Sequence, residues 1–61
     1  MCESTAYYVT SSGLEPIMEN VIFAIPCDNG VFLEDILGEQ VTAEGKIKEI
    51  KLLDHKILIE K

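Results

Sequence analysis

The sequence predicts an all-β protein, built as a small, strongly bent antiparallel sheet or barrel of about five or six short strands. Its apolar residues come in short runs rich in β-branched and aromatic side chains, and Gly, Pro, Asn and Ser residues separate these runs at short intervals. A chain of 61 residues has room for one domain, over residues 1–61. A domain of this size buries only about 60 % of its extended-state surface, so a bound metal or a partner subunit would add needed stability.

The first half of the chain predicts two strands. Residues 5–10 alternate across two faces and end at a Ser-Ser-Gly turn signal over residues 11–13. Pro16 is then expected to break the chain. Residues 20–25 form an apolar stretch that is too short for a typical helix. Because both faces of this stretch are apolar, we expect it to be covered on both sides.

The middle of the chain predicts a hairpin. Pro26 closes the preceding strand, and the Asp-Asn-Gly sequence of residues 28–30 is the clearest turn signal, because Asn-Gly tolerates the positive φ angles of a tight turn. Residues 31–37 return as a strand, and Gly38 turns the chain again.

The last third continues as β-structure. From Val41 onward, apolar and polar residues alternate, and this alternation slips by one position at residues 49–50, as a β-bulge would make it slip. Residues 54–55 predict a second short turn. A helix over residues 46–53 is the competing prediction. We reject it because the segment lacks a capping signal and runs through a turn into a β-branched strand.

Charge and composition argue against some functions and for others. The formal net charge is −6: residues 1–45 hold eight acids and no base (−8), whereas residues 46–61 hold five Lys against three acids (+2). With no Arg and a pI near 4.4, the chain is poorly suited to bind nucleic-acid phosphates. Hydrophobic residues make up 48 % of this small chain, which indicates burial between subunits. A homodimer is therefore expected.

Cys2 is the most informative single residue. If Met1 is removed after synthesis, Cys2 carries a free α-amino group and a thiol on adjacent carbons, which close a five-membered chelate ring around a metal ion. Thiolate and amine nitrogen donors suit Ni(II) or Cu, and Ni(II) favours square-planar N/S sites. One such residue supplies too few ligands for a closed site, so a metal bound here implies a second subunit. The alternative is that Cys2 is only a small residue near a chain terminus.

Two other residues with metal-binding side chains are given structural interpretations. His55 stands beside Asp54 in a predicted turn, and turns lie on the surface, so we expect a solvated residue rather than a ligand. Cys27 is expected to be buried as a small hydrophobic residue.

Two consecutive pairs of side chains are also expected to be structural. Glu34 and Asp35 fall on opposite faces of a strand, so they do not form a carboxylate site, and one of them is expected near the sheet edge or paired with Lys. Tyr7 and Tyr8 likewise cannot share one face, which favours core or interface packing over the stacking of bases.

Catalysis and membrane association are not expected. The chain has no Gly-rich phosphate loop and no nucleophile elbow, and no spacing supports pairing His55 with Cys2 or Cys27 for acyl transfer. So small a chain could hardly enclose a substrate pocket. We find no signal peptide, no apolar run of spanning length and no Gly at position two for myristoylation. The cysteines form no disulfide framework, so the expected location is the cytoplasm, with both thiols reduced.

Three segments together resemble the CooT family. They are residues 1–7 (MCESTAY), residues 30–39 (GVFLEDILGE) and residues 48–60 (KEIKLLDHKILIE). The family consists of small proteins named for an accessory factor of nickel-containing carbon monoxide dehydrogenase, and they are often described as predicted RNA-binding proteins. The resemblance covers nearly the whole chain, and the Cys directly after the initiator Met is its most distinctive chemical feature.

The resemblance implies a compact Sm- or SH3-like protomer, a homodimer, and one Ni(II) held at the dimer interface by Cys2 of each subunit. The amide of Glu3 is an additional candidate donor, whereas His55 and Cys27 inherit no role. The expected function is a nickel-binding accessory protein that stores the metal or delivers it to a client during nickel-enzyme maturation. The alternatives are an Sm-like RNA-binding module and an interaction subunit without a ligand.

Overall fold

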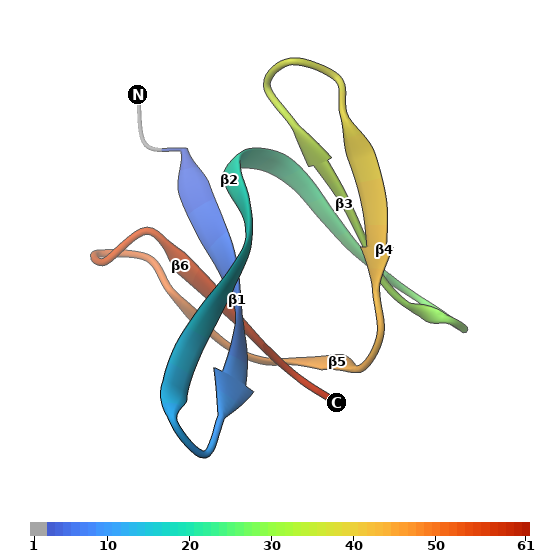
Figure 1. Cartoon of the computed structure of the whole chain (residues 1–61). Coiled ribbons are helices and arrows are strands. Elements are labelled where there is room, and N and C mark those ends of the chain that lie inside the picture. Colours follow the sequence, from blue (N-terminus) through green and yellow to red (C-terminus); the bar gives the residue numbers. More distant parts are fainter. Residues whose placement is uncertain (1–2) are drawn as a thin grey trace.

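A computed structural model describes residues 3–61, and these fold into one curled β-sheet (Figure 1). The sheet has six strands: β1 (Ser4–Thr10), β2 (Gly13–Cys27), β3 (Gly30–Asp35), β4 (Gln40–Ala43), β5 (Lys46–Lys51) and β6 (Lys56–Glu60). The predicted all-β class is confirmed, and residues 46–51 form a strand rather than the rejected helix, although the predicted strand ends before Leu52 and Leu53. No element between residues 3 and 61 is a helix, so this part of the chain contains none that could cross a membrane.

The strand order is β4-β3-β2-β1-β6-β5, which leaves β4 and β5 as the sheet edges. One pairing differs from the antiparallel expectation, because β1 and β6 run parallel, from the Thr5–Lys56 pair to the Tyr8–Ile59 pair. Parallel neighbours need a long crossover connection. Here the rest of the sheet supplies that crossover, which local sequence patterns do not report. The last strand of the chain therefore lies directly beside the first.

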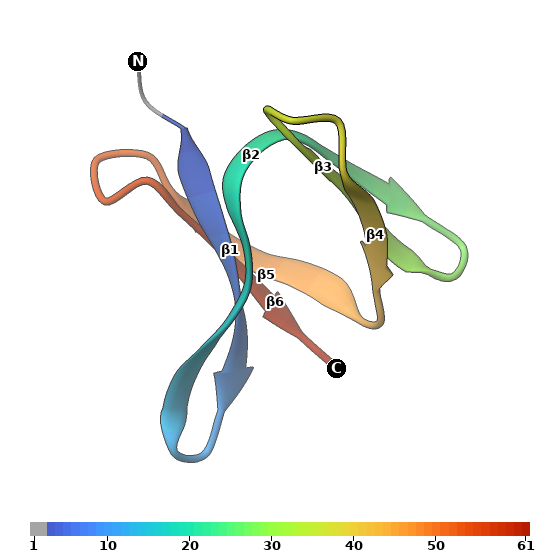
Figure 2. The ribbon, with the colours of Figure 1, turned by 45° about the horizontal axis from the view of Figure 1, so that its top comes forward.

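The long strand β2 gives the sheet its curvature (Figure 2). Its register shifts twice against β1, between Met18 and Pro16 and between Val21 and Met18, and once against β3, between Val21 and Phe23. Each shift adds one residue to β2 relative to its neighbour, and such bulges bend a strand and increase its twist. Asn20, inside this bent stretch, has a φ of 55°.

The prediction that Pro16 breaks the chain is wrong. Pro16 lies inside β2 and pairs with Tyr7, next to one of the bulges. The first part of β2 pairs with β1 only, since β3 pairs with residues 21–27. A proline is tolerated at a bulge and on a strand with one free edge, because no ladder hydrogen bond is then lost.

The turns follow the sequence signals with small displacements. The hairpin at residues 28–30 is confirmed, although the turn itself consists of residues 28–29 and the positive φ falls on Gly30 alone. The alternating stretch after Val41 bends at Gly45, which separates β4 from β5. The predicted bulge is present, with the register shift between Ile47 and Glu49.

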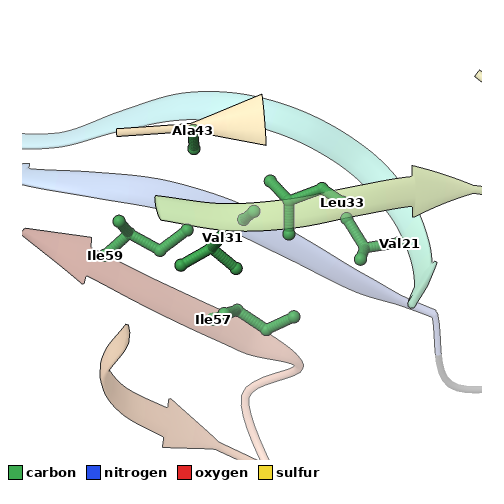
Figure 3. Packing of buried hydrophobic residues seen from close by; sticks show 7 residues of the cluster. Val21, Val31, Leu33, Ala43, Ile57 and Ile59 are labelled. Atoms are coloured by element: carbon green, nitrogen blue, oxygen red, sulfur yellow. The ribbon is translucent and has the colours of Figure 1, made fainter. Parts of the chain in front are cut away.

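The core lies on the inner face of the curled sheet. Seven buried apolar residues from five strands form it: Ala6, Val21, Val31, Leu33, Ala43, Ile57 and Ile59, most of them labelled in Figure 3. The expectation that residues 20–25 are covered on both sides is wrong, because Val21 is buried but Phe23 and Ile25 are each 50 % exposed. Within the described part of the chain, the sheet is covered on one face of this segment only.

Candidate functional site

The start of β1 is the reference point for the predicted metal site. Cys2 lies outside the described residues, so its role as a ligand stays a prediction. Glu3, the other predicted donor, is half-buried and directly precedes β1. Ser4 pairs with Val21 at the bend of β2, so the beginning of the described chain is fixed against the middle of the sheet.

Two connections lie beside the start of β1: the β3–β4 loop (residues 36–39) and the β5–β6 turn (residues 52–55). The Thr5 N–H donates to the carbonyl of His55, with an N···O distance of 2.9 Å. On the other side, the Ile36 N–H donates to the carbonyl of Asn20 at 3.0 Å, one residue before Val21. Figures 1 and 2 show both connections on the same side of the molecule as the start of β1. We call this side the N-terminal end.

His55 is exposed, as predicted for a turn residue. The sequence did not reveal that its turn folds back onto β1, three residues after Cys2. The signal in the sequence was weak: His55 adopts a φ of 56°, a conformation in which His is enriched, but nothing local specifies the partner of its carbonyl. Residues 3–61 contain no group of three or more His, Cys, Asp or Glu side chains that could hold a metal.

The prediction that Cys27 is a buried hydrophobic residue is wrong. Cys27 is an exposed free thiol at the end of β2, on the opposite side of the molecule from the start of β1 (Figure 1). It lines an open hollow of about 460 Å³ together with Gly45, Lys46 and Lys61. The β2–β3 hairpin follows directly, and the Cys27 side chain is exposed beside it. Cys27 lies in a different region from the predicted site of Cys2.

Exposed aliphatic side chains gather in the two connections at the N-terminal end. Leu37 is 83 % exposed in the β3–β4 loop, and Leu52 and Leu53 are 79 % and 96 % exposed in the β5–β6 turn. The predicted strand over residues 31–37 ends earlier, at Asp35, which leaves Leu37 outside the sheet. Residues 49–54 line an open hollow of about 490 Å³. None of these leucines belongs to the core.

Asp35 organises the β3–β4 loop. Its Oδ1 atom accepts hydrogen bonds from the N–H groups of Leu37 and Glu39, both at 2.9 Å, and its side chain is buried. Glu34, on the opposite face as predicted, accepts a hydrogen bond from the side chain of Gln40 at 3.2 Å. Gln40 belongs to the edge strand β4, so the expectation that one of the two carboxylates lies near the sheet edge or pairs with Lys is confirmed in its first form. The loop conformation follows from Asp35 acting as a backbone cap.

The tyrosines and lysines have structural roles that fit the packing interpretation. Tyr8 packs against the core, and its ring lies 4.9 Å from the Lys61 ammonium. Tyr7 faces Leu58 across the parallel pair, with Lys56 above its ring at 5.9 Å. The two rings point to opposite faces, so they do not form one stacking platform for bases.

Comparisons with known proteins agree with this architecture. A sequence model of the CooT family, described as CO dehydrogenase accessory protein CooT, matches residues 1–60. An uncharacterized protein of Methanothermobacter thermautotrophicus is 42 % identical over 60 residues, which cover 98 % of this chain and 89 % of that protein.

A solved structure is also similar. It is the crystal structure of a CooT candidate from Carboxydothermus hydrogenoformans, with a TM-score of 0.90, 38 % identity, and coverage of 98 % of this chain and 97 % of that one. The family description supports an accessory role. Both the sequence match over nearly the whole chain and the shared fold lead to one conclusion: the chain belongs to the CooT family.

Proposed function

We propose that this protein is a homodimeric accessory protein that binds one Ni(II) between the Cys2 residues of two subunits. It stores the metal or delivers it to a client in the cytoplasm during maturation of a nickel enzyme. The single observation that carries the proposal is the position of Cys2, directly after Met1, in a chain of a family described as accessory to CO dehydrogenase.

The ligand count supports a shared site. Each chain brings one thiolate from Cys2 and a nitrogen donor beside it, either the α-amino group or the amide of Glu3. Two chains thus supply two sulfur and two nitrogen donors, the square-planar set that Ni(II) favours. No competing cluster of metal-binding side chains exists within residues 3–61. Nickel is the cargo in this proposal, and a site at a chain terminus leaves it accessible for transfer.

The experiment compares the two cysteines. Purified Cys2→Ser and Cys27→Ser variants are titrated with Ni(II), and the dimer fraction is measured by light scattering. We expect Cys2→Ser to lose stoichiometric nickel binding while remaining folded and dimeric. Cys27→Ser is the matched control, because its thiol is exposed on the opposite side, and it should bind nickel like the wild type. Unchanged affinity in Cys2→Ser would end the proposal.

Native mass spectrometry of the wild type tests the donor set. One spectrum reports removal of Met1, the number of subunits and the number of bound metal ions. We expect two chains per Ni(II). Removal of Met1 assigns the nitrogen donor to the α-amino group, whereas retention assigns it to backbone amides.

A further inference from the structure

The two edges of the sheet differ in how they are protected against pairing with another strand. The β5 edge carries three lysines, and its register against β6 shifts between Ile47 and Glu49. Lysines and bulges are common features that keep an edge strand from adding a neighbour. The β4 edge (Gln40–Ala43) has no charged side chain within the strand, and it pairs with β3 without a register shift. Of the two edges, β4 is therefore the one that can accept a further strand.

The backbone of β4 offers free hydrogen-bonding groups at two positions. At the closed end of the β3–β4 hairpin, the Asp35 N–H donates to the carbonyl of Glu39 at 3.0 Å. Hydrogen-bonded and non-hydrogen-bonded pairs alternate along an antiparallel ladder, so the odd-numbered residues of β4 bond to β3. The N–H and C=O groups of Gln40 and Thr42 therefore face the free edge of the sheet (Figure 1). Both residues are exposed, so these groups are accessible to a partner strand.

The two faces of the sheet beside this edge differ in chemistry. Val41 pairs with the buried Leu33 and shares its inner face, yet Val41 is 40 % exposed, because β4 is the last strand on this side of the sheet. On the outer face, the half-buried Glu34 accepts a hydrogen bond from Gln40. Successive side chains of a strand point to opposite faces. A strand added to β4 therefore places alternate side chains against Val41 and on the face of Glu34.

Acidic residues surround the β4 edge. Glu39 precedes β4 and Glu44 follows it, both exposed, and Glu34 lies on the adjacent strand. Residues 30–45 include no base, and the next base along the chain is Lys46, in β5. This charge favours a basic partner. It disfavours a second copy of the edge, because an antiparallel β4–β4 pair brings Glu39 of one chain close to Glu44 of the other, and like charges across strands are destabilising.

The geometry points to β4 as the docking site for an extended, basic segment of a partner protein, which adds to the sheet as a further strand. In this binding mode, main-chain hydrogen bonds supply affinity and alternate side chains supply specificity. The segment pairs along the four residues of β4. Its apolar side chains cover Val41, and the Lys or Arg side chains between them face the acidic residues. The inference goes beyond nickel binding and holds whether or not Cys2 binds a metal.

The first test uses capped, fluorescent peptides of alternating Lys and Val residues, without metal. The peptide residues opposite Gln40 and Thr42 share the outer face, so they are the lysines, and their amides pair with β4. We expect anisotropy to report binding, and hydrogen exchange at Gln40 and Thr42 to slow. N-methyl groups on the Lys amides should weaken binding by about tenfold or more. The matched control carries N-methyl groups on the Val amides, which point away from β4, and should bind like the parent peptide.

Three results of this test contradict the inference. They are no binding of the parent peptide, equal affinity of the two methylated peptides, and unchanged hydrogen exchange along β4. Each would show that main-chain pairing at this edge does not hold the segment.

The second test changes the edge itself. Thr42→Pro removes an N–H that faces the free edge but removes no hydrogen bond to β3, and proline is tolerated at such positions. We expect the affinity for the parent peptide to fall about tenfold or more, with an unchanged circular dichroism spectrum. Sedimentation without peptide tests the other occupant. An assembly of the wild type that Thr42→Pro dissolves would place another copy of this chain on β4 and overturn the inference.

The third test separates local charge from net charge. Glu44→Lys should weaken binding of the parent peptide by about tenfold, because it places a base beside the basic segment. Glu15→Lys is the matched control, since it changes the net charge equally at an exposed position in the part of β2 that pairs only with β1. Its affinity should stay within about twofold of the wild type. Equal losses in the two variants would mean that net charge alone attracts the peptide, and the inference would fail.

Discussion

The two connections at the N-terminal end differ in amino-acid composition from the turns elsewhere in the molecule. Away from the N-terminal end, the connections are polar: Ser-Ser at residues 11–12, Asp-Asn at 28–29 and Glu-Gly at 44–45. At the N-terminal end, they are rich in leucine, and those leucines make no core contacts. The polar turns place polar side chains in solvent, whereas the connections at the N-terminal end leave leucine side chains exposed.

The glycines at the turns differ in how closely neighbouring backbone packs against them. A Cβ atom on Gly30 would collide with the carbonyl of Ala43, and one on Gly45 with the carbonyl of Glu60, so both turns are packed against neighbouring backbone. At Gly38, in the β3–β4 loop, no atom lies within 4 Å of the same position. The turns at Gly30 and Gly45 are therefore constrained by the sheet, whereas Gly38 in the apolar loop, like Gly13 after the Ser-Ser turn, has free space around it.

Gly45→Ala is expected to have the largest effect. The added methyl group meets the Glu60 backbone at a φ of +111°, so steric overlap and backbone strain together should cost roughly 2–5 kcal/mol. Gly38→Ala, which adds strain without overlap, should cost about 1 kcal/mol. Urea unfolding measures both. If both variants lose the same free energy of unfolding, the closer backbone packing at Gly45 has no effect on stability.

Asp35→Ala should have the next largest effect. It leaves the N–H groups of Leu37 and Glu39 without their acceptor, at an expected cost of about 1–3 kcal/mol. Glu34→Ala is the control, because its exposed hydrogen bond to Gln40 should contribute less than about 1 kcal/mol. Hydrogen exchange at Leu37 and Glu39 should accelerate in the Asp35 variant only. An unchanged exchange pattern would contradict the capping role.

Lys48→Ala should have a small effect. The Lys48–Glu60 ion pair has an N···O distance of 3.9 Å, and both side chains are about half-exposed, at 48 % and 55 %. Such pairs contribute about 0–1 kcal/mol. We expect a change of less than about 0.5 kcal/mol in urea unfolding, and a larger loss would mean that the β5 edge depends on this charge.

The protein is expected to bind RNA too weakly to be detected. The lysines are confined to residues 46–61, and residues 1–45 carry only acids among their charged side chains. We expect no retention of labelled single-stranded RNA on filters even at low salt. Affinity that falls steeply with added salt would instead favour the Sm-like RNA-binding alternative.

Much of the fold could be predicted because its signals are local. Alternating β-branched residues marked β1, and Asn-Gly marked the hairpin before β3. The bend of β2 and the parallel pair of β1 and β6 could not be predicted, because both depend on contacts between distant segments. Asn20, a residue that tolerates a positive φ within an apolar run, was the one local sign of the bend.

The candidate site was predictable only in its chemistry. Cys2 was recognised from the donors it carries, without any knowledge of its surroundings. Leu37, Leu52 and Leu53 were interpreted as strand residues, because apolar side chains normally indicate burial. These leucines are exposed because β3 ends at Asp35 and β5 at Lys51, only one or two residues before them, and the sequence does not fix strand ends that closely.

The parallel pairing of β1 with β6 has a consequence for the synthesis of this protein. A ribosome makes β1 before β6, so β1 lacks one of its two neighbours until residues 56–60 have left the exit tunnel. The carbonyl of His55, which accepts the Thr5 N–H, also arrives only then. A chain cut short before residue 56 would therefore lack the strand that pairs with β1.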